Sequence, residues 1–460
     1  MSLAASNAAC GPDDFSPSDA GDASTDAVEG STDGGVPCDP SKDAKCVDEA
    51  KGIFVSSTGK ADGAGTKGDP ISSLANALAK AKSSAKARLY VCEGSYAGSV
   101  DIADAIAIYG GFACATWTYG GTKPVVQADK PAYAMKISAN AEVYDLSLVG
   151  KAGVAASESS IGVLASGAIT VKLVRVTVEA GAGVKGADAV LVPYTTFPTQ
   201  GQLNGKGASG GTGGSANPIT CPGGATTTGG KGGDNGFGGD NGLPNLGAGQ
   251  GGTAGSCGTT GTGKDGTPAT GASPAAAITT RGGLAGTWAP TSGAKGPDGP
   301  PGQGGGGGFG SGGGGGGGGG AGGCGGAGGP GGGGGGASIA LIAIDAVVTL
   351  SESELITTNA GDGGKGVAGQ AAQVEFGFFA GGTPPGCGGG NGGKGGAAGS
   401  SGGGAGGISV GIPSQGTQPP TDTATDGKIT FGTKGNKGVG GTPTVNDGVD
   451  GVAQAVLQIP

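Results

Sequence analysis

Nine cysteines are the residues of this 460-residue chain with the most obvious chemistry. Eight of them follow one another as sequence neighbours, namely Cys38, Cys46, Cys92, Cys114, Cys221, Cys257, Cys324 and Cys387. This usage favours disulfides formed in an oxidising compartment over free buried thiols. Eight cysteines allow many connectivities, and joining each to its neighbour predicts Cys38–Cys46, Cys92–Cys114, Cys221–Cys257 and Cys324–Cys387.

Composition excludes several other chemistries. The chain has no histidine, which excludes a general-base histidine, a Ser-His-Asp triad and a histidine-rich zinc site. No two cysteines have the CxxC spacing of a cysteine-only metal site. A net charge of −9 with only three arginines argues against nucleic-acid binding. We therefore expect no metal and no cofactor.

Two groups of acidic residues are candidate sites. Asp101 and Asp104, in VDIADA, have the residue type of the paired acids of a polysaccharide lyase or hydrolase, but they flank a turn, where aspartate is common. Because arginine is so scarce, no Arg or Lys is expected near them to bind a uronic acid. Asp234, in GGKGGDNGFGGDNG, occupies the sixth place of a calcium-binding nonapeptide, yet the eighth place is Gly236 and the repeat does not continue. Neither group predicts an enzyme.

Three aromatic residues have two interpretations. Trp117, Tyr119 and Trp288 could stack on sugar rings, or their rings could cover the end of the folded core. The closeness of Trp117 and Tyr119 to Cys114 favours the second interpretation.

The first 50 residues differ from the rest. Residues 11–50 are acidic and rich in Ser, Gly and Pro, which predicts a disordered tether. Cys10, in AACG just before this stretch, resembles the lipid-bearing first residue of a mature bacterial lipoprotein, although Asn7 stands where such a signal usually has Leu. We expect Cys10 to be a lipid anchor.

Short apolar runs separated by Gly or Ser turns fill residues 51–200. One strand is expected at Ile53–Ser56 and one helix at Ile71–Ala81, and three short strands then recur every 20–30 residues, which is a coil-by-coil pattern. The stretches IFVSSTGKADGAGTKGDPISSLANALAKA and VCEGSYAGSVDIADAIAIYGGF resemble the right-handed parallel β-helix proteins secreted by bacteria. That resemblance implies an all-β solenoid with an N-terminal capping helix. Further coils are expected at 337–356 and 407–460.

Glycine dominates the segments between these coils. Residues 201–336 contain 61 glycines, and residues 357–406 form a second glycine-rich insertion. Non-glycine residues recur at every third position, which matches an extended helix with three residues per turn. These Gly-Gly-X (PGRS-like) runs resemble the polyglycine-II bundles of glycine-rich antifreeze proteins and phage adhesins. Collagen-like assembly and disordered glycine loops are the alternatives. The candidate exposed face of such a bundle shares one phase of three: Lys231, Asp234, Phe237, Asp240 and Leu243.

These features predict a non-enzymatic cell-surface or extracellular protein with a structural or adhesive role. Its expected partner is a surface polysaccharide or a protein, with membrane contact only through the lipid anchor. The expected location is the bacterial cell surface, as an outer-membrane lipoprotein, or the extracellular medium. The alternatives are a carbohydrate-active β-helix enzyme and, from the antifreeze resemblance, an ice-binding protein.

Overall fold

The computed structural model describes residues 38–416 and 428–460. The fold described below is that of the unit Pro40–Pro460. The predicted lipid anchor Cys10 and most of the predicted tether lie outside the described residues.

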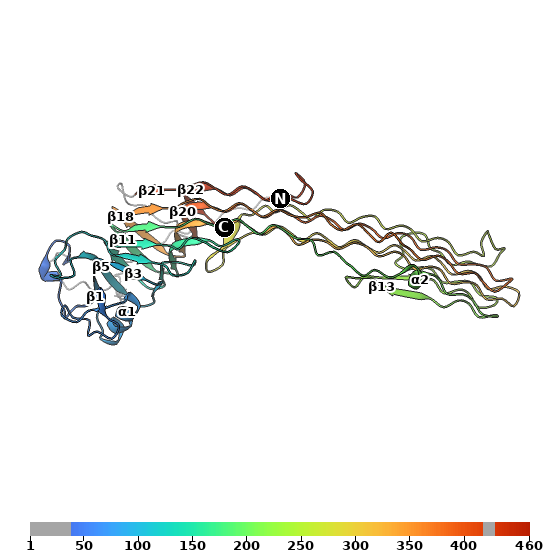
Figure 1. Cartoon of the computed structure of the whole chain (residues 1–460), viewed down its shortest axis with the longest axis horizontal. Coiled ribbons are helices and arrows are strands. Elements are labelled where there is room, and N and C mark those ends of the chain that lie inside the picture. The colour runs from blue at the N-terminus through green and yellow to red at the C-terminus, as the bar shows by residue number, and fades with distance from the viewer. Residues whose placement is uncertain (1–37, 417–427) are drawn as a thin grey trace, which may run out of the picture. The chain divides into compact units, whose positions relative to one another are not determined.

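Three six-stranded parallel sheets carry nearly all of the strands (Figure 1). Sheet A contains β1 (Gly52–Lys60), β2 (Arg88–Cys92), β5 (Ile106–Phe112), β8 (Ala141–Tyr144), β11 (Thr170–Val174) and β18 (Val347–Ser351). Sheet B contains β3 (Ser95–Ala97), β6 (Val125–Gln127), β9 (Ser147–Val149), β12 (Thr177–Glu179), β19 (Glu354–Ile356) and β21 (Lys428–Thr430). Sheet C contains β4 (Val100–Ile102), β7 (Met135–Ile137), β10 (Ser160–Ser166), β17 (Ser338–Ile344), β20 (Ser409–Gln415) and β22 (Ala453–Gln458). This confirms the expected all-β class with parallel strands.

The chain visits the sheets in a fixed order. From β2 to β12 it passes from sheet A to sheet B to sheet C and back to sheet A. Side chains from all three sheets, such as Ile108, Leu148 and Ile137, are fully buried in one hydrophobic cluster. The short strands are therefore held together by the apolar surface that they bury jointly as well as by their ladders.

The helix α1 (Leu74–Ser83) begins three residues later than expected. Ser73 is its N-cap, and the Ser73 hydroxyl accepts a hydrogen bond from the amide of Asn76. The preceding Ile71 is buried and bridges Val55 as a strand residue does. The predicted helix included Ile71 because its apolar spacing also fits a helix. Ile71 instead packs into the same core from an extended backbone.

Both tryptophans cover buried surface. Trp117 lies edge-on against Phe54, with ring centroids 4.8 Å apart, and its indole N–H donates to the carbonyl of Lys67. Trp288 belongs to the hairpin of β15 (Gly282–Leu284) and β16 (Trp288–Pro290), and it joins a second cluster with Ile339 of β17. Each is only 5% exposed, so neither ring is available to a sugar.

Three glycine-rich excursions leave the sheets at the same point of the cycle. Residues 181–336, 359–407 and 432–451 each follow a strand of sheet B and lead back to a strand of sheet C. Their few regular elements include the short helix α2 (Gln200–Leu203) and the hairpin of β13 (Asn217–Thr220) and β14 (Thr226–Gly229). The first excursion starts about twenty residues before residue 201, because Gly183 already donates to Asn359. Together these residues are called the glycine bundle below.

Backbone hydrogen bonds in the glycine bundle recur at every third residue. Residues 293–308 run antiparallel to residues 317–332 and donate six N–H bonds of 2.8–2.9 Å to them. The donor and acceptor pairs are Gly293–Gly332, Gly296–Gly329, Gly299–Gly326, Gly302–Gly323, Gly305–Gly320 and Gly308–Gly317. In Figure 1 the segments of the bundle are drawn as extended traces that lie side by side.

Consecutive residues of one segment bond to different neighbours. Gly318 donates to Lys206, Gly319 to Gly230 and Gly320 to Gly390, at 2.9, 2.9 and 3.0 Å. Each segment thus has three bonding directions, whereas a β-strand has two. Residues 314–327 are buried along their whole length. Backbone atoms fill the interior of the bundle, so its core has almost no side chains.

The disulfides tie this bundle together. The Cys92–Cys114 bond is as predicted, and Cys38 and Cys46 are both disulfide-bonded. The predicted Cys221–Cys257 and Cys324–Cys387 bonds are wrong. The structure has Cys221–Cys324 and Cys257–Cys387 instead.

Chain reversals explain this error. Cys221 lies in the turn between β13 and β14, which meets the long buried segment containing Cys324. Cys257 lies in the turn between Thr253 and Thr260 and meets Cys387 of another segment. Sequence neighbours are separated because the chain reverses between them. With all eight described cysteines oxidised, the protein belongs to an oxidising compartment, extracellular or periplasmic.

Peptide mapping of the unreduced protein tests these connections. We expect linked peptides for Cys221–Cys324 and Cys257–Cys387, because the turns and the long segments meet only when the bundle has formed. A digest after reduction is the control. Linked peptides for Cys221–Cys257 would contradict the arrangement of the segments.

A single methyl group tests the backbone packing of the bundle. A Cβ atom at Gly325 would overlap the carbonyl group of Gly299, so we expect Gly325→Ala to lower the free energy of unfolding by about 1–3 kcal/mol or more. At the exposed Gly207 a Cβ atom would have no heavy atom within 4 Å, and Gly207→Ala is the matched control. The stability of both variants is compared by thermal unfolding monitored with limited proteolysis. Equal stability of the two would show that the segments do not pack through their backbones.

Candidate functional site

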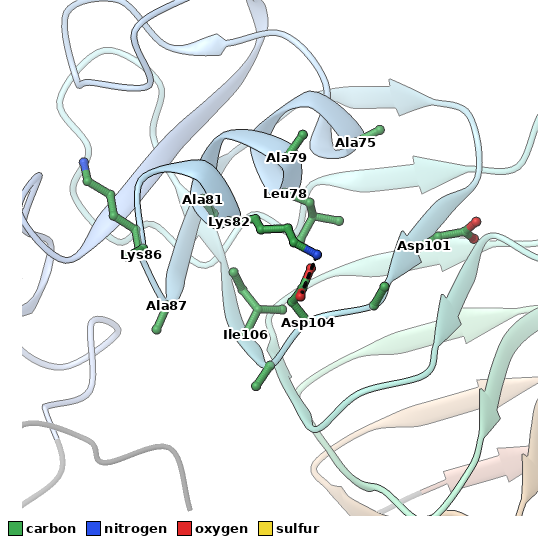
Figure 2. A pocket seen from close by; sticks show the side chains of 13 residues that line it. Ala75, Leu78, Ala79, Ala81, Lys82, Lys86, Ala87, Asp101, Asp104 and Ile106 are labelled. Atoms are coloured by element: carbon green, nitrogen blue, oxygen red, sulfur yellow. Dashed lines mark ion pairs between the residues drawn. The ribbon is translucent and has the colours of Figure 1, made fainter. Parts of the chain in front are cut away.

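A cavity of about 480 Å³ lies between α1 and the connection from β4 to β5 (Figure 2). Alanine side chains line most of it, together with Leu78 and Ile106. Asp104 does not face another acid there, because its carboxylate lies 3.0 Å from Lys82 Nζ. The expectation that no Lys stands near these acids is therefore wrong: α1 brings Lys82 across to Asp104.

The second acid of this cavity has a separate environment. Figure 2 shows the Asp101 side chain directed away from Asp104. Burial, and then a hydrogen bond to Asp101, raise the pKa of Tyr133. Glycoside hydrolysis by paired acids needs two carboxyl groups on either side of one bond. Asp101 and Asp104 instead form two unrelated surface contacts.

The predicted bundle face folds back on itself. The amide of Phe237 donates to the carbonyl of Asp234, Gly236 has a φ of +85°, and the chain reverses there. Asp240 then donates back to Lys231 at 2.8 Å. The five residues from Lys231 to Leu243 therefore do not follow one rod, although their phase of three is unbroken.

Each residue of that set has its own place. The Lys231 ammonium lies 3.1 Å from the Asp234 carboxylate. Phe237 is 70% exposed at the turn, Asp240 is exposed on the returning segment, and Leu243 is 53% exposed where that segment ends. The other oxygen of Asp234 accepts the amide of Gly213 at 2.8 Å. Within the described residues, no group of three or more His, Cys, Asp or Glu side chains is placed to hold a metal ion.

Acidic side chains on the outside of the bundle share one contact. Asp188 accepts the amide of Lys365, Asp298 that of Gly328 and Asp265 that of Asn391, at 2.7–2.8 Å. In each case the amide belongs to a neighbouring segment. The carboxylate takes the place of a backbone carbonyl where no further segment follows. These side chains therefore complete the hydrogen bonding at the edges of the glycine bundle.

A sequence pattern marks several of these edges. Lysine precedes aspartate by three residues in Lys185–Asp188, Lys231–Asp234 and Lys295–Asp298, and each pair forms an ion pair. In a helix with three residues per turn, such residues lie on one edge. The Lys-x-x-Asp spacing is a signal that the sequence analysis missed.

Contacts of this kind lower the pKa values of three aspartates. The pKa of Asp188 lies below its ordinary value because of the Lys185 ammonium and then the Lys365 amide. For Asp234 the Gly213 amide is the main cause and Lys231 the second, and for Asp450 the main cause is the Lys437 amide. All three carboxylates are stabilised in the charged form.

Large apolar side chains project from the glycine bundle. Val374 is 75% exposed, and Phe378 and Phe379 are each 52% exposed. The neighbouring Phe376 is half-buried and lines a second hollow of about 250 Å³ on the bundle. A cluster of this kind on a protein surface is typical of an interaction site. The sequence analysis did not select this stretch.

Comparisons with known proteins provide no family. No family model, curated protein or solved structure matches the chain. Among the residues that the structure describes, no helix is long and apolar enough to cross a membrane.

Acid titration tests the role of the edge aspartates. The folded-state pKa values of Asp188, Asp234 and Asp450 are lowered, so the unfolded chain binds more protons, and the contribution of these three to stability is complete above the unfolded pKa of about 4. We expect the unfolding temperature to fall as the pH decreases below about 4 and these carboxylates become protonated. Asp234→Asn keeps an acceptor for Gly213 without a titrating group, and we expect it to lose less stability in acid. A rise in the unfolding temperature of the wild type below that pH would contradict this account.

Proposed function

We propose that this chain is a non-enzymatic protein of the cell surface or the extracellular space that displays a polyglycine-II bundle on a right-handed parallel β-helix. Its role is adhesion or the building of the cell envelope. The observation that carries the proposal is an exposed set of large apolar side chains on a bundle whose core is backbone.

The order of the strands supports the β-helix. One turn of the chain supplies one strand to each of three parallel sheets, and the buried side chains of all three meet in one cluster. Stacking of such coils, each contacting only its neighbours, is how solenoid proteins are built. In this arrangement α1 caps the first coils, since Leu74 and Ala77 are buried in the same cluster.

The three bonding directions of each glycine-rich segment support polyglycine II. An isolated extended helix with three residues per turn has no internal hydrogen bonds. Gly318, Gly319 and Gly320 show how neighbouring segments supply them, and the buried segments contain glycine because backbones must approach closely. Single collagen-like triple helices do not have this number of neighbours.

The distribution of side chains supports adhesion over catalysis. The large cavity contains an exposed ion pair and alanine side chains, whereas Val374, Phe378 and Phe379 project from the bundle. A rigid bundle loses little conformational entropy when its side chains bind a partner. The bundle therefore suits a protein that holds a surface in contact without transforming it.

A lipid on Cys10 with an acidic tether would hold this protein at the bacterial outer surface. The AACG sequence and the composition of residues 11–50 support that location, and so does the full oxidation of the described cysteines. Free release into the medium remains the alternative location.

Bead retention tests the adhesive function. Beads coated with the full chain should remain on surfaces coated with bacterial envelope polysaccharide or envelope protein under flow, at least several-fold more than albumin-coated beads. The same material should release no reducing sugar during incubation with the protein. Retention equal to albumin on every surface would refute adhesion, and sugar release would refute the non-enzymatic assignment.

A further inference from the structure

The hollow of about 250 Å³ on the bundle, lined by Phe376, is a groove whose floor is glycine. Residues 388–394 lie in the middle, since Gly266 donates to Asn391 at 2.7 Å and Gly392 donates to Gly377 at 2.8 Å. The floor includes Gly392 and Gly393, which are buried. A Cβ atom at Gly392 would overlap the carbonyl group of Ala321, and one at Gly393 that of Thr267, so this floor packs closely against its neighbours. Phe376 and Pro268 line it from the two flanking segments.

Polar groups at this groove keep unused hydrogen-bonding capacity. Asp265 uses Oδ1 for the amide of Asn391, and Asn391 uses Oδ1 for the amide of Phe379. Within residues 38–416 and 428–460, the Asp265 Oδ2, the Asn391 Nδ2 and the Lys394 Nζ have no hydrogen-bond or ion-pair partner. The groove therefore offers one strong acceptor and two donors around an aromatic ring.

This combination fits a neutral sugar. One face of a sugar ring is apolar and can stack on Phe376, while its hydroxyl groups both donate and accept hydrogen bonds. The carboxylate of Asp265 and the ammonium of Lys394 leave the groove without net charge, so it has no excess positive charge to select a uronic acid over a neutral sugar. A protein partner would need a broader apolar core than one ring on a glycine floor.

A second aromatic side chain follows Phe376 on the same segment. Phe379 follows Phe376 by three residues, which is one turn or about 9 Å in a helix of this kind. Its ring lies over Gly388, since a Cβ atom there would be 3.2 Å from the ring. Two aromatic platforms one turn apart favour a chain of sugars over a single sugar.

We propose that this groove, lined by Asp265, Phe376, Asn391 and Lys394, binds a neutral polysaccharide along residues 388–394. The proposal rests on the adhesive function and identifies the class of its partner. Phe376 and Phe379 stack on alternating sugar rings, and the three polar groups bond to their hydroxyls.

Calorimetry with defined oligosaccharides tests the groove. The probes are hexamers of β-1,4-linked glucose and of β-1,4-linked N-acetylglucosamine, with an oligogalacturonate as the acidic comparison. We expect the full chain to bind at least one neutral hexamer more tightly than the acidic one. Phe376→Ala should weaken that binding by about tenfold or more, because the stacking surface is lost. Phe237→Ala removes a more exposed ring outside the groove and should leave the affinity unchanged.

Two further variants separate recognition from folding. Lys394→Met keeps the length of the side chain and removes the donor, and Asp265→Asn keeps an acceptor for the amide of Asn391 while removing the charge. Both should weaken binding several-fold at an unchanged unfolding temperature. Unchanged affinity in Phe376→Ala and Lys394→Met, absence of binding to both neutral hexamers, or preference for the acidic one would overturn the proposal.

Bead retention distinguishes failure of the polysaccharide groove from failure of the adhesive function. Wild-type adhesion that persists in Phe376→Ala, or that depends only on envelope protein, removes the polysaccharide groove and leaves the adhesive function. Lack of adhesion by the wild type removes the function itself. Adhesion that is lost in Phe376→Ala and inhibited by the neutral hexamer supports both.

Discussion

The hydrogen bond between neighbouring extended segments is the interaction on which this structure depends. An extended segment makes no hydrogen bonds to itself, so every buried amide and carbonyl must find a partner on another segment. Gly318, Gly319 and Gly320 find theirs on three different segments, and this is possible only where no side chain separates the backbones. The abundance of glycine follows from this geometry. So do the repeated reversals of the chain, because one chain must provide all of its own neighbours.

At the outer edges of the bundle no further segment supplies hydrogen-bond partners, and side chains supply them instead. Aspartate carboxylates such as that of Asp298 accept amides that would otherwise have no partner. Proline removes the donor altogether, and Pro268, Pro297 and Pro300 are exposed on segments of the bundle. Edge strands of β-sheets are protected in comparable ways against pairing with other chains. The outer surface of the bundle is therefore protected against pairing with further chains.

Some parts of this structure can be predicted from the sequence and others cannot. The coil pattern and the period of three are visible because each repeats a local rule, and the parallel all-β class followed from them. The reversal after Asp234 was not visible, because the phase of three continues unchanged through Gly236 while the backbone turns. The Cys221–Cys324 bond was missed for the same reason, since glycine carries no side-chain identity that says which segments are adjacent. The groove was out of reach as well: Asp265, Phe376 and Lys394 come from three segments that only the lattice brings together.

The join between the bundle and the sheets shows what fixes the register of the bundle. Gly332, Gly335 and Ser338 donate to Gly402, Ala405 and Ile408 in one unbroken series, so the hydrogen bonds of the bundle run directly into sheet C. There β17 is held by β10 on one side and β20 on the other, and its side chains are fixed in the hydrophobic clusters. Glycine segments alone could slide by one turn without changing any contact, because every third residue is equivalent. A strand cannot slide in this way, because its apolar side chains would lose their places in the core. The sheets therefore determine the alignment of the bundle together with the Cys221–Cys324 and Cys257–Cys387 bonds, and each excursion returns to sheet C in a position that the side chains of the sheets have fixed.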